Sequence, residues 1–319
     1  MVGAVGGSVR FVIRRMISEP NVYGCWNARA AGLDQTAEDA IETAARAEFD
    51  GVDLLVRDIL ESGVNVGDLR LRMDDLGLRG GAWPLPVNWR NDVETFEADL
   101  ARLPLLAATA ARLGLFITGT WVRFESEPVD DATLENEASR ERVVERETAR
   151  QIDRLDRVAR ILNDHGSRLA LEIIGPRSER TGGGVPLVGT HAELARRFAP
   201  LRDARPNVGV LVDSFHLFAA GEELENALVW GPSSVVWVHL ADPARGDRQT
   251  LRDVERSLPG EFSSTRVRSI LAALARHGYD GPVTVEPLSR CRSLEGLDPL
   301  QRARKVREAL RRVWPPAPP

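Results

Sequence analysis

Residues 208–216 read Val-Gly-Val-Leu-Val-Asp-Ser-Phe-His, an apolar run that becomes polar only towards its end. Short runs rich in Val, Leu and Ile, with no alternation of polar residues, are typical of parallel strands that are buried on both faces. Three further runs have the same pattern, at residues 167–174 (SRLALEII), 235–242 (VVWVHLAD) and 281–288 (GPVTVEPL). The sequence therefore predicts a buried parallel sheet whose strands carry polar groups near their carboxyl ends.

Strand-like runs also occur earlier in the chain, at residues 10–18, 50–56, 77–86 and 114–122. Helical patterns separate the runs, as at residues 265–279. Eight alternating units of strand and helix predict an α/β fold, a closed (β/α)8 TIM barrel. We expect residues 1–319 to form this single domain, with a short N-terminal extension and a frayed Pro-rich C-terminal tail.

The composition favours a soluble protein that binds a small molecule. The formal charge of −5 provides no basic surface for nucleic acid or for an anionic membrane. The two cysteines, Cys25 and Cys291, fit a reducing compartment, and the N-terminus has no clean signal core. Because no stretch approaches a membrane span, we expect a cytoplasmic location. The charged stretch from Asp131 to His165 is expected to be a solvated helix face, with a contact in a homo-oligomer as the alternative.

The basic residues are almost all arginine, and Lys305 is the single lysine. It lies in a charged helical pattern near the C-terminus, which is typical of a solvated helix face. Schiff-base aldolases and pyridoxal phosphate enzymes need a lysine that is desolvated in a pocket. The sequence therefore argues against both classes of enzyme.

Each of the four deciding runs delivers one side chain near its C-terminal end: Glu172, Asp213, His239 and Glu286. In a (β/α)8 barrel these strand ends meet at one mouth, where the site lies. Three carboxylates and one imidazole suit a divalent metal, and four such groups could hardly sit close together without one. The sequence therefore predicts a metal site formed by these four residues.

The residues from about 167 to 288 resemble the xylose isomerase-like TIM barrel superfamily of sugar phosphate isomerases and epimerases, and within it the inosose isomerase type. The resemblance is carried by Glu172-Ile-Ile-Gly, Asn207 to His216, Val-His239-Leu-Ala-Asp242, Leu251-Arg-Asp253, Arg256-Ser-Leu-Pro-Gly260, Gly278-Tyr-Asp-Gly-Pro282 and Val-Glu286. The order and spacing of these motifs together are more specific than any one of them. The first half of the chain matches only in its rhythm of strands and helices.

The resemblance implies that the four strand-end residues bind one divalent cation, with Mn²⁺ preferred and Mg²⁺, Co²⁺ or Zn²⁺ as alternatives. It also implies that Glu172 and Glu286 move protons and that His216 contacts a substrate oxygen. Arg245 stands six residues after the metal histidine, where ketose 3-epimerases of the family place a substrate-binding arginine.

Other residues are expected to contact or support the substrate. Arg256 follows in the same polar loop as Arg245, and Trp83 and Trp121 stand at strand ends, where an indole could cover a sugar ring or simply pack. Asp242 is expected to support the metal ligands from behind.

The chain departs from the ketose 3-epimerase pattern at Ser178, where a second glutamate would stand, and from the inosose isomerase pattern at Phe262, where a glycine is usual. We therefore expect a ring-shaped substrate, a cyclic polyol ketone or a similar sugar.

The chemistry follows from the residue types. Moving a proton next to a carbonyl develops an enediolate, whose charge a divalent cation stabilises while carboxylates remove and return the proton. This predicts a metal-dependent isomerase or epimerase. A lyase with the same enolising site, such as a dehydratase or a C-glycoside-cleaving enzyme, and a ketose 3-epimerase are the alternatives. A metal site that serves only binding or assembly is less favoured, because both glutamates are present.

Overall fold

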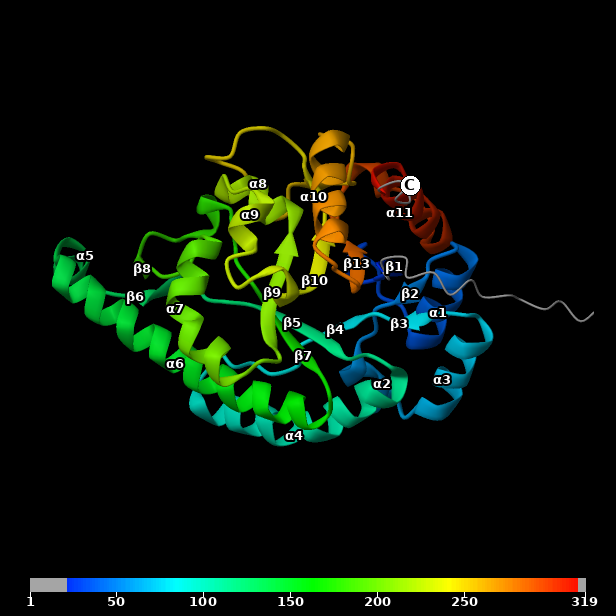
Figure 1. Ribbon diagram of the computed structural model, residues 1–319, viewed down its shortest axis with the longest axis horizontal. Helices are drawn as coiled ribbons and strands as arrows, with labels where there is room; N and C mark the ends of the chain where they lie inside the picture. Colours follow the sequence, from blue (N-terminus) through cyan, green and yellow to red (C-terminus); the bar gives the residue numbers. More distant parts are fainter. Residues whose placement is uncertain (1–21, 315–319) are drawn as a thin grey trace, which may run out of the picture.

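The computed structural model describes residues 22–314, and its centre is a parallel barrel surrounded by helices (Figure 1). Its strand segments follow the order β3-β2-β1-β13-β10-β9-β7-β5-β4. Only Gly81 separates β3 (Arg79–Gly80) from β4 (Ala82–Pro84), so the two continue one strand. The nine segments thus occupy eight positions around the barrel, and the predicted (β/α)8 TIM barrel is confirmed.

The other barrel strands are β1 (Tyr23–Trp26), β2 (Gly51–Val52), β5 (Ile117–Trp121), β7 (Arg168–Glu172), β9 (Val208–Asp213), β10 (Val235–Leu240) and β13 (Pro282–Val285). Every residue of β9 and β10 is buried, as their unbroken apolar runs predict. The strand predicted at residues 10–18 lies outside the described residues. The structure places β1 in the first position of the barrel, a four-residue strand too short to show a clear pattern.

Helices form the outer layer of the barrel. They are α1 (Ala37–Arg46), α2 (Val56–Ser62), α3 (Val66–Asp75), α4 (Val93–Leu113), α5 (Asp131–Glu135), α6 (Glu137–Asp164), α7 (His191–Ala204), α8 (Ser214–Ala220), α9 (Leu224–Ala227), α10 (Ser264–Arg276) and α11 (Pro299–Val313). The first and last of these, α1 and α11, lie side by side and complete the ring (Figure 1). The predicted N-terminal extension and Pro-rich tail fall outside the described residues, and the single-domain assignment of residues 1–319 stays a prediction.

Three helices show why these segments fold as they do. Asp92 accepts a hydrogen bond from the Thr95 amide and so caps α4, and Asp298 forms a capping box with Gln301 at the start of α11. Along α6, apolar residues at helical spacing are buried against the barrel although the helix is highly charged elsewhere. No helix among residues 22–314 is long and apolar enough to cross a membrane.

Two small antiparallel ribbons were not expected from the sequence. One pairs β6 (Glu125–Pro128) with β8 (Gly184–Pro186), and the other pairs β11 (Asp242–Pro243) with β12 (Arg256–Ser257). Strands of two to four residues carry no readable periodicity, which is why sequence reasoning missed them. They lie in the segments that follow β5, β7 and β10, so they are at the C-terminal end of the barrel.

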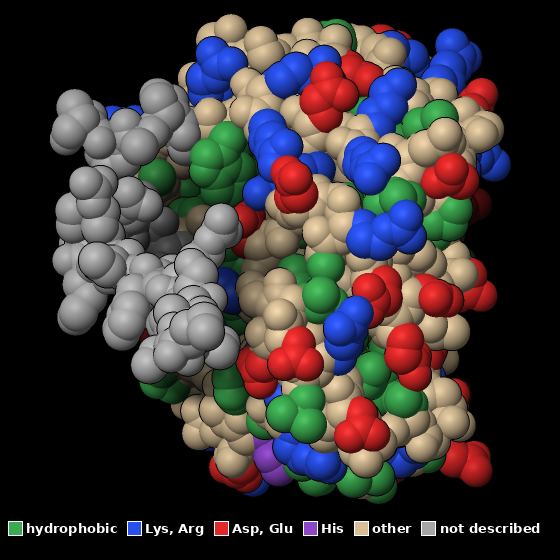
Figure 2. All heavy atoms as spheres, turned by 90° about the vertical axis from the view of Figure 1, so that its right-hand side faces the viewer, with side chains coloured by type: hydrophobic (Ala, Val, Ile, Leu, Met, Phe, Trp, Pro, Cys, Tyr) green, Lys and Arg blue, Asp and Glu red, His purple; other side chains and the backbone are tan. Residues whose placement is uncertain are grey.

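Side chains fill the barrel interior. At position 119 their packing leaves no room for a residue larger than glycine. The Trp237 indole lies against Gly119, where an added Cβ would come within 2.9 Å of the ring. Outside the barrel, basic and acidic side chains are interspersed on the face drawn in Figure 2, so that face carries no broad surface of one sign.

We expect the two leucines that flank Pro104 in α4 to differ sharply in their effect on stability. Leu103 is fully buried, whereas Leu105 is 64% exposed. Leu103→Ala should lower the free energy of unfolding by about 2–5 kcal/mol, because it leaves a cavity under the helix. Leu105→Ala, the matched control, should change it by less than about 0.5 kcal/mol. Urea unfolding followed by circular dichroism measures both, and equal losses would contradict this packing of α4.

Candidate metal centre

The four predicted ligands lie together at the C-terminal mouth of the barrel. Glu172 ends β7, Asp213 ends β9, His239 is the fifth of the six residues of β10, and Glu286 follows β13 directly. One candidate ligand atom from each residue lies within 4.8 Å of those from the others.

The register of the strands explains this convergence. Asp213 pairs with His239 across β9 and β10, and His239 pairs with Thr284 across β10 and β13. Because neighbouring parallel strands are in near alignment at this end, residues at or just past each last pair reach the same layer. The His239 Nδ1 atom lies 3.1 Å from a Glu286 oxygen and 3.8 Å from a Glu172 oxygen.

The residues present fit a divalent cation. The Glu172 Oε1 atom is buried, has no hydrogen-bond partner among residues 22–314 and lies 3.8 Å from His239 Nδ1. A buried polar atom without a partner costs free energy, and an ion that accepts its lone pair would remove this cost. A set of three carboxylates and one imidazole is suited to Mn²⁺, Zn²⁺ and related ions.

The cluster carries more negative charge than its surroundings neutralise. Burial raises the pKa of Glu172 well above its usual value, with the Glu286 and Asp213 carboxylates acting in the same direction. Burial opposes the charged form of His239, but the Glu286 and Glu172 carboxylates outweigh it and raise the pKa of the imidazole to about 9. Protons therefore occupy the cluster at neutral pH, where a cation would compete with them.

Arg256 is part of the same cluster. Its guanidinium is buried and donates to Asp213 Oδ2 at 2.7 Å and to Glu286 Oε2 at 3.1 Å. It also donates to the Asp253 side chain at 2.6 Å and to the Asp253 carbonyl at 3.0 Å. Burial raises the pKa of Asp213, but the Arg256 charge outweighs it and holds that pKa well below its usual range. Arg256 thus fixes the orientation of two of the four candidate ligands.

His216 lies beside the cluster in a defined tautomeric state. Its Nδ1 atom accepts a hydrogen bond from the Gly175 amide at 3.2 Å. Burial lowers the pKa of His216, so the ring is neutral and its one proton resides on Nε2. The 3.2 Å approach of Arg256 Nη2 to this Nε2 atom then brings two donors together and is a contact, not a hydrogen bond. His216 therefore presents an N–H donor, 3.8 Å from the Glu172 carboxylate.

Comparison with known proteins agrees with this fold. Residues 41–313 match the model of the xylose isomerase-like TIM barrel family, which covers most of the chain. The chain belongs to this family. The resemblance carried by the sequence motifs is thereby confirmed at the level of the family.

Solved structures of this family superpose on the chain over most of its length. A xylose isomerase domain protein from Alicyclobacillus acidocaldarius subsp. acidocaldarius has 26% identity and a TM-score of 0.74, over 92% of this chain and 98% of that one. The IOLI protein with a bound zinc atom has 18% identity and a TM-score of 0.71, over 91% and 98% of the two chains. The 3-keto-D-glucoside 4-epimerase YcjR of E. coli has 15% identity and a TM-score of 0.66, over 92% and 98%. No curated protein matches the sequence.

The two tryptophans predicted to contact the substrate lie in different environments in this xylose isomerase-like barrel. Trp121 ends β5 as the backbone partner of Glu172, is 36% exposed, and has the Arg90 guanidinium 3.7 Å from the centre of its ring. Trp83 is fully buried in the main core, which favours the packing alternative for this indole.

The second predicted arginine does not join the cluster. Arg245 forms a two-pronged ion pair with Glu255, at 2.7 and 3.0 Å, and bonds to Thr250, all within its own loop. Asp242 accepts three backbone N–H groups, from Gly260, Phe262 and Ser263, at 2.8–3.1 Å. This carboxylate therefore anchors the loop between β12 and α10 and supports the ligands only indirectly.

Sequence reasoning missed a buried polar network below the metal layer. Asp53 Oδ2 accepts from Thr284 Oγ1 at 2.6 Å, and Trp237 Nε1 donates to the same hydroxyl at 3.0 Å. The Trp237 ring meets the edge of His239, with centroids 4.3 Å apart. Asp53 stands in the middle of the run DGVDLLV, so no strand-end signal marks it in the sequence, and only the end of β2 at Val52 places it just past a strand.

Metal binding should require the four residues and should release protons. We expect about one divalent ion per purified chain by elemental analysis, and loss of that ion in Asp213→Ala and His239→Ala. At pH 7 binding should displace the proton held on His239, whose pKa is raised to about 9, so affinity should fall as the pH falls below about 9. Titration calorimetry in two buffers of different ionisation enthalpy measures this release.

Asp75→Ala is the control, because Asp75 is exposed on α3. A binding heat that is independent of the buffer, or full metal content in either ligand variant, would contradict the assigned site.

Proposed function

We propose that this protein is a divalent-metal-dependent isomerase or epimerase of a sugar or a cyclic polyol ketone, which removes and returns a proton next to a carbonyl. The convergence of Glu172 and Glu286 with Asp213 and His239, with ligand atoms within 4.8 Å, carries the proposal. A neighbour of the same fold, YcjR, is a 3-keto-D-glucoside 4-epimerase, and the IOLI protein holds zinc.

Glu172, Asp213, His239 and Glu286 would hold the ion. Mn²⁺ is our first choice, with Mg²⁺, Co²⁺ and Zn²⁺ as alternatives, because carboxylate and imidazole donors suit all four. When bound, the cation supplies a positive charge that stabilises the negative charge developing on two neighbouring oxygens of the substrate.

We infer that the two glutamates act from different sides of the substrate. In the barrel order β7 and β13 are separated by β9 and β10, so Glu172 and Glu286 approach the site from strands that are not neighbours. One carboxylate would take the proton beside the carbonyl and the other would return one, each contributing about 10²–10⁴ in rate. His216 would donate its Nε2 proton to a substrate oxygen, because its tautomer leaves this atom as a donor.

The contacts of Ser178 support a ring-shaped substrate. Ser178 Oγ donates to the Leu251 carbonyl at 2.5 Å, and Glu179 accepts from the Asp253 amide at 2.9 Å, so the loop after β7 is tied to the loop after β10. Ser178 occupies the position at which ketose 3-epimerases carry a second glutamate. The short Ser178 side chain is used in this link, so no carboxylate is present at this position to bind an open-chain ketohexose.

We also propose a cytoplasmic location. Cys25 and Cys291 are both buried and unpaired, which suits a reducing compartment.

Solvent deuterium should enter the product. We expect the protein, assayed with Mn²⁺ in deuterated water against ketoses, inososes and keto-glycosides, to place deuterium at the carbon next to the carbonyl of its substrate. Mass spectrometry reads the label. Glu172→Gln and Glu286→Gln should lose turnover while keeping the protein folded, and one of them should still exchange the proton on its own face.

Turnover without label would indicate a direct hydride shift and refute the proposed reaction. Turnover unchanged in both glutamine variants would remove the glutamates from it.

The two arginines should differ in their effect on catalysis. Arg256→Gln should lower kcat by about 10²-fold or more, because Arg256 orients Asp213 and Glu286 at the reacting centre. Arg245→Gln should change kcat by less than about tenfold, because Arg245 is bound to Glu255 within its loop. Any larger effect of this variant should be on KM. Steady-state kinetics with the substrate found above measures both, and a larger loss in the Arg245 variant would reverse the assignment.

A further inference from the structure

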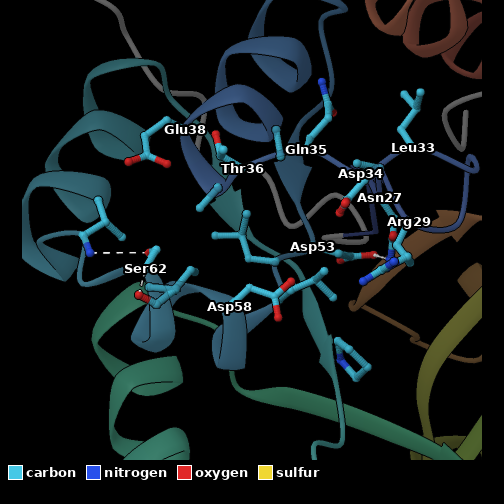
Figure 3. Close-up of a pocket in the computed structure, with 18 residues that line it drawn as sticks. Asn27, Arg29, Leu33, Asp34, Gln35, Thr36, Glu38, Asp53, Asp58 and Ser62 are labelled. Atoms are coloured by element: carbon cyan, nitrogen blue, oxygen red, sulfur yellow. Dashed lines mark hydrogen bonds between the residues drawn. The ribbon is translucent and has the colours of Figure 1, made fainter.

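A cavity of about 450 Å³ lies beside the barrel mouth, where the chain leaves β1, β2 and β4 (Figure 3). Its inner wall includes Asn27, Asp53 and Pro84, and it extends outwards between the start of α1 and helix α2. The volume falls within the range of roughly 300–1,000 Å³ that small-molecule sites occupy. The mechanism proposed above uses none of its residues.

The charged part of this cavity's lining is mainly acidic. Asp34, Glu38, Asp53 and Asp58 face one basic residue, Arg29. Figure 3 shows Asp53, Asn27 and Arg29 close together, with Asp58 and Glu38 on other parts of the wall. Among residues 22–314 none of the four carboxylates has an ion-pair partner. Asp34, Glu38 and Asp58 are exposed and open to other hydrogen-bond donors, whereas Asp53 is buried and already accepts from Asn27, Ala82 and Thr284. Such a lining would repel a phosphate or a carboxylate and would accept bonds from hydroxyl groups.

The remainder of the lining is aliphatic. Leu33, Leu54, Leu55 and Pro84 contribute apolar surface, and no aromatic ring lines the cavity in the described part of the chain. Hydroxyl groups around the edge and C–H groups on the face are the two features of a sugar ring. Carboxylates next to aliphatic side chains match both features, whereas a planar aromatic group would find no ring to stack on.

The cavity is joined to the metal centre through Asp53. Its Oδ2 atom accepts from Asn27 at 3.1 Å and from Thr284 at 2.6 Å, and Thr284 is the strand partner of His239. Asp53 therefore contacts the cavity on one side and the layer below the metal ligands on the other. The cavity lies where the chain leaves β1, β2 and β4, and Glu286 follows β13, the strand paired with β1, so the cavity and the candidate metal centre lie at the same end of the barrel.

We propose that the cavity binds a second, uncharged hydroxylated unit of the substrate. The ketone that reacts at the metal centre is then joined to another sugar or polyol unit, so the natural substrate is a keto-glycoside rather than a free monosaccharide. This inference rests on the proposed isomerase or epimerase function and adds the class of its substrate.

Calorimetric binding of unreactive sugars tests the cavity independently of catalysis. The probes are cellobiose, maltose and trehalose, compared with glucose and with glucose 6-phosphate. At least one disaccharide should bind about tenfold more tightly than glucose, and Asp34→Ala/Asp58→Ala should abolish this difference, because a tenfold change corresponds to the loss of one or two hydrogen bonds. Both residues are exposed, so the double variant should fold, which circular dichroism checks. Asp75→Ala, outside the cavity, is the control and should bind like the wild type.

Disaccharides that bind no better than glucose, an unchanged double variant, or tighter binding of glucose 6-phosphate would overturn the proposal. Deuterium exchange with a 3-keto-disaccharide and with the corresponding free keto sugar separates it from the proposed function. Equal exchange rates for both sugars would refute the binding of a second unit but would leave the proposed isomerase or epimerase function standing. Disaccharide binding that depends on Asp34 and Asp58, with no exchange in any ketone, would support the cavity and refute the reaction.

Discussion

Three carboxylates buried at one end of a barrel repel each other, and much of this mouth is organised around compensating that repulsion. Glu172, Asp213 and Glu286 cannot all be charged in a low-dielectric site without positive partners. Within residues 22–314 the positive charge comes from Arg256 and from a proton on His239. A divalent cation supplies the same compensation more compactly and leaves the carboxylates free of protons.

The loops at the mouth can be understood as supports for this arrangement of charges. Arg256 is delivered by β12, which pairs with β11, and the turn that follows β12 is anchored by the Asp242 carboxylate. Asp253 fixes the guanidinium from outside, and its amide is held in turn by Glu179 from the loop after β7. The loops after β7 and β10 are thereby both tied to the position of the Arg256 guanidinium. Displacing any of these residues would move Arg256, and this would disturb Asp213 and Glu286 more than the barrel strands.

The sequence predicted the barrel and the four strand-end residues because both depend on local pattern. Unbroken apolar runs identify buried parallel strands, and a polar residue at the end of each is visible without knowledge of the fold. The ribbons were missed since strands as short as Arg256–Ser257 have no periodicity. Arg245 and Arg256 could not be distinguished, because both stand in one polar loop and only tertiary pairing with Glu255 or with Asp213 separates them. Trp83 and Trp121 were both predicted at strand ends, but Trp83 is the middle residue of β4 and fully buried, whereas Trp121 ends β5 and is partly exposed, a difference that depends on their neighbours in the fold.

The close approach of Gly175 to His216, to which its amide also donates a hydrogen bond, limits which residues can follow Glu172 in this barrel. A Cβ atom on Gly175 would come within 2.3 Å of the His216 carbonyl oxygen, so no larger residue fits without moving the backbone of α8. A residue other than glycine at position 175 therefore requires the loop after Glu172 or the start of α8 to move. Changes of specificity through this loop, in nature or in a combinatorial library, are accommodated most easily beyond Gly175.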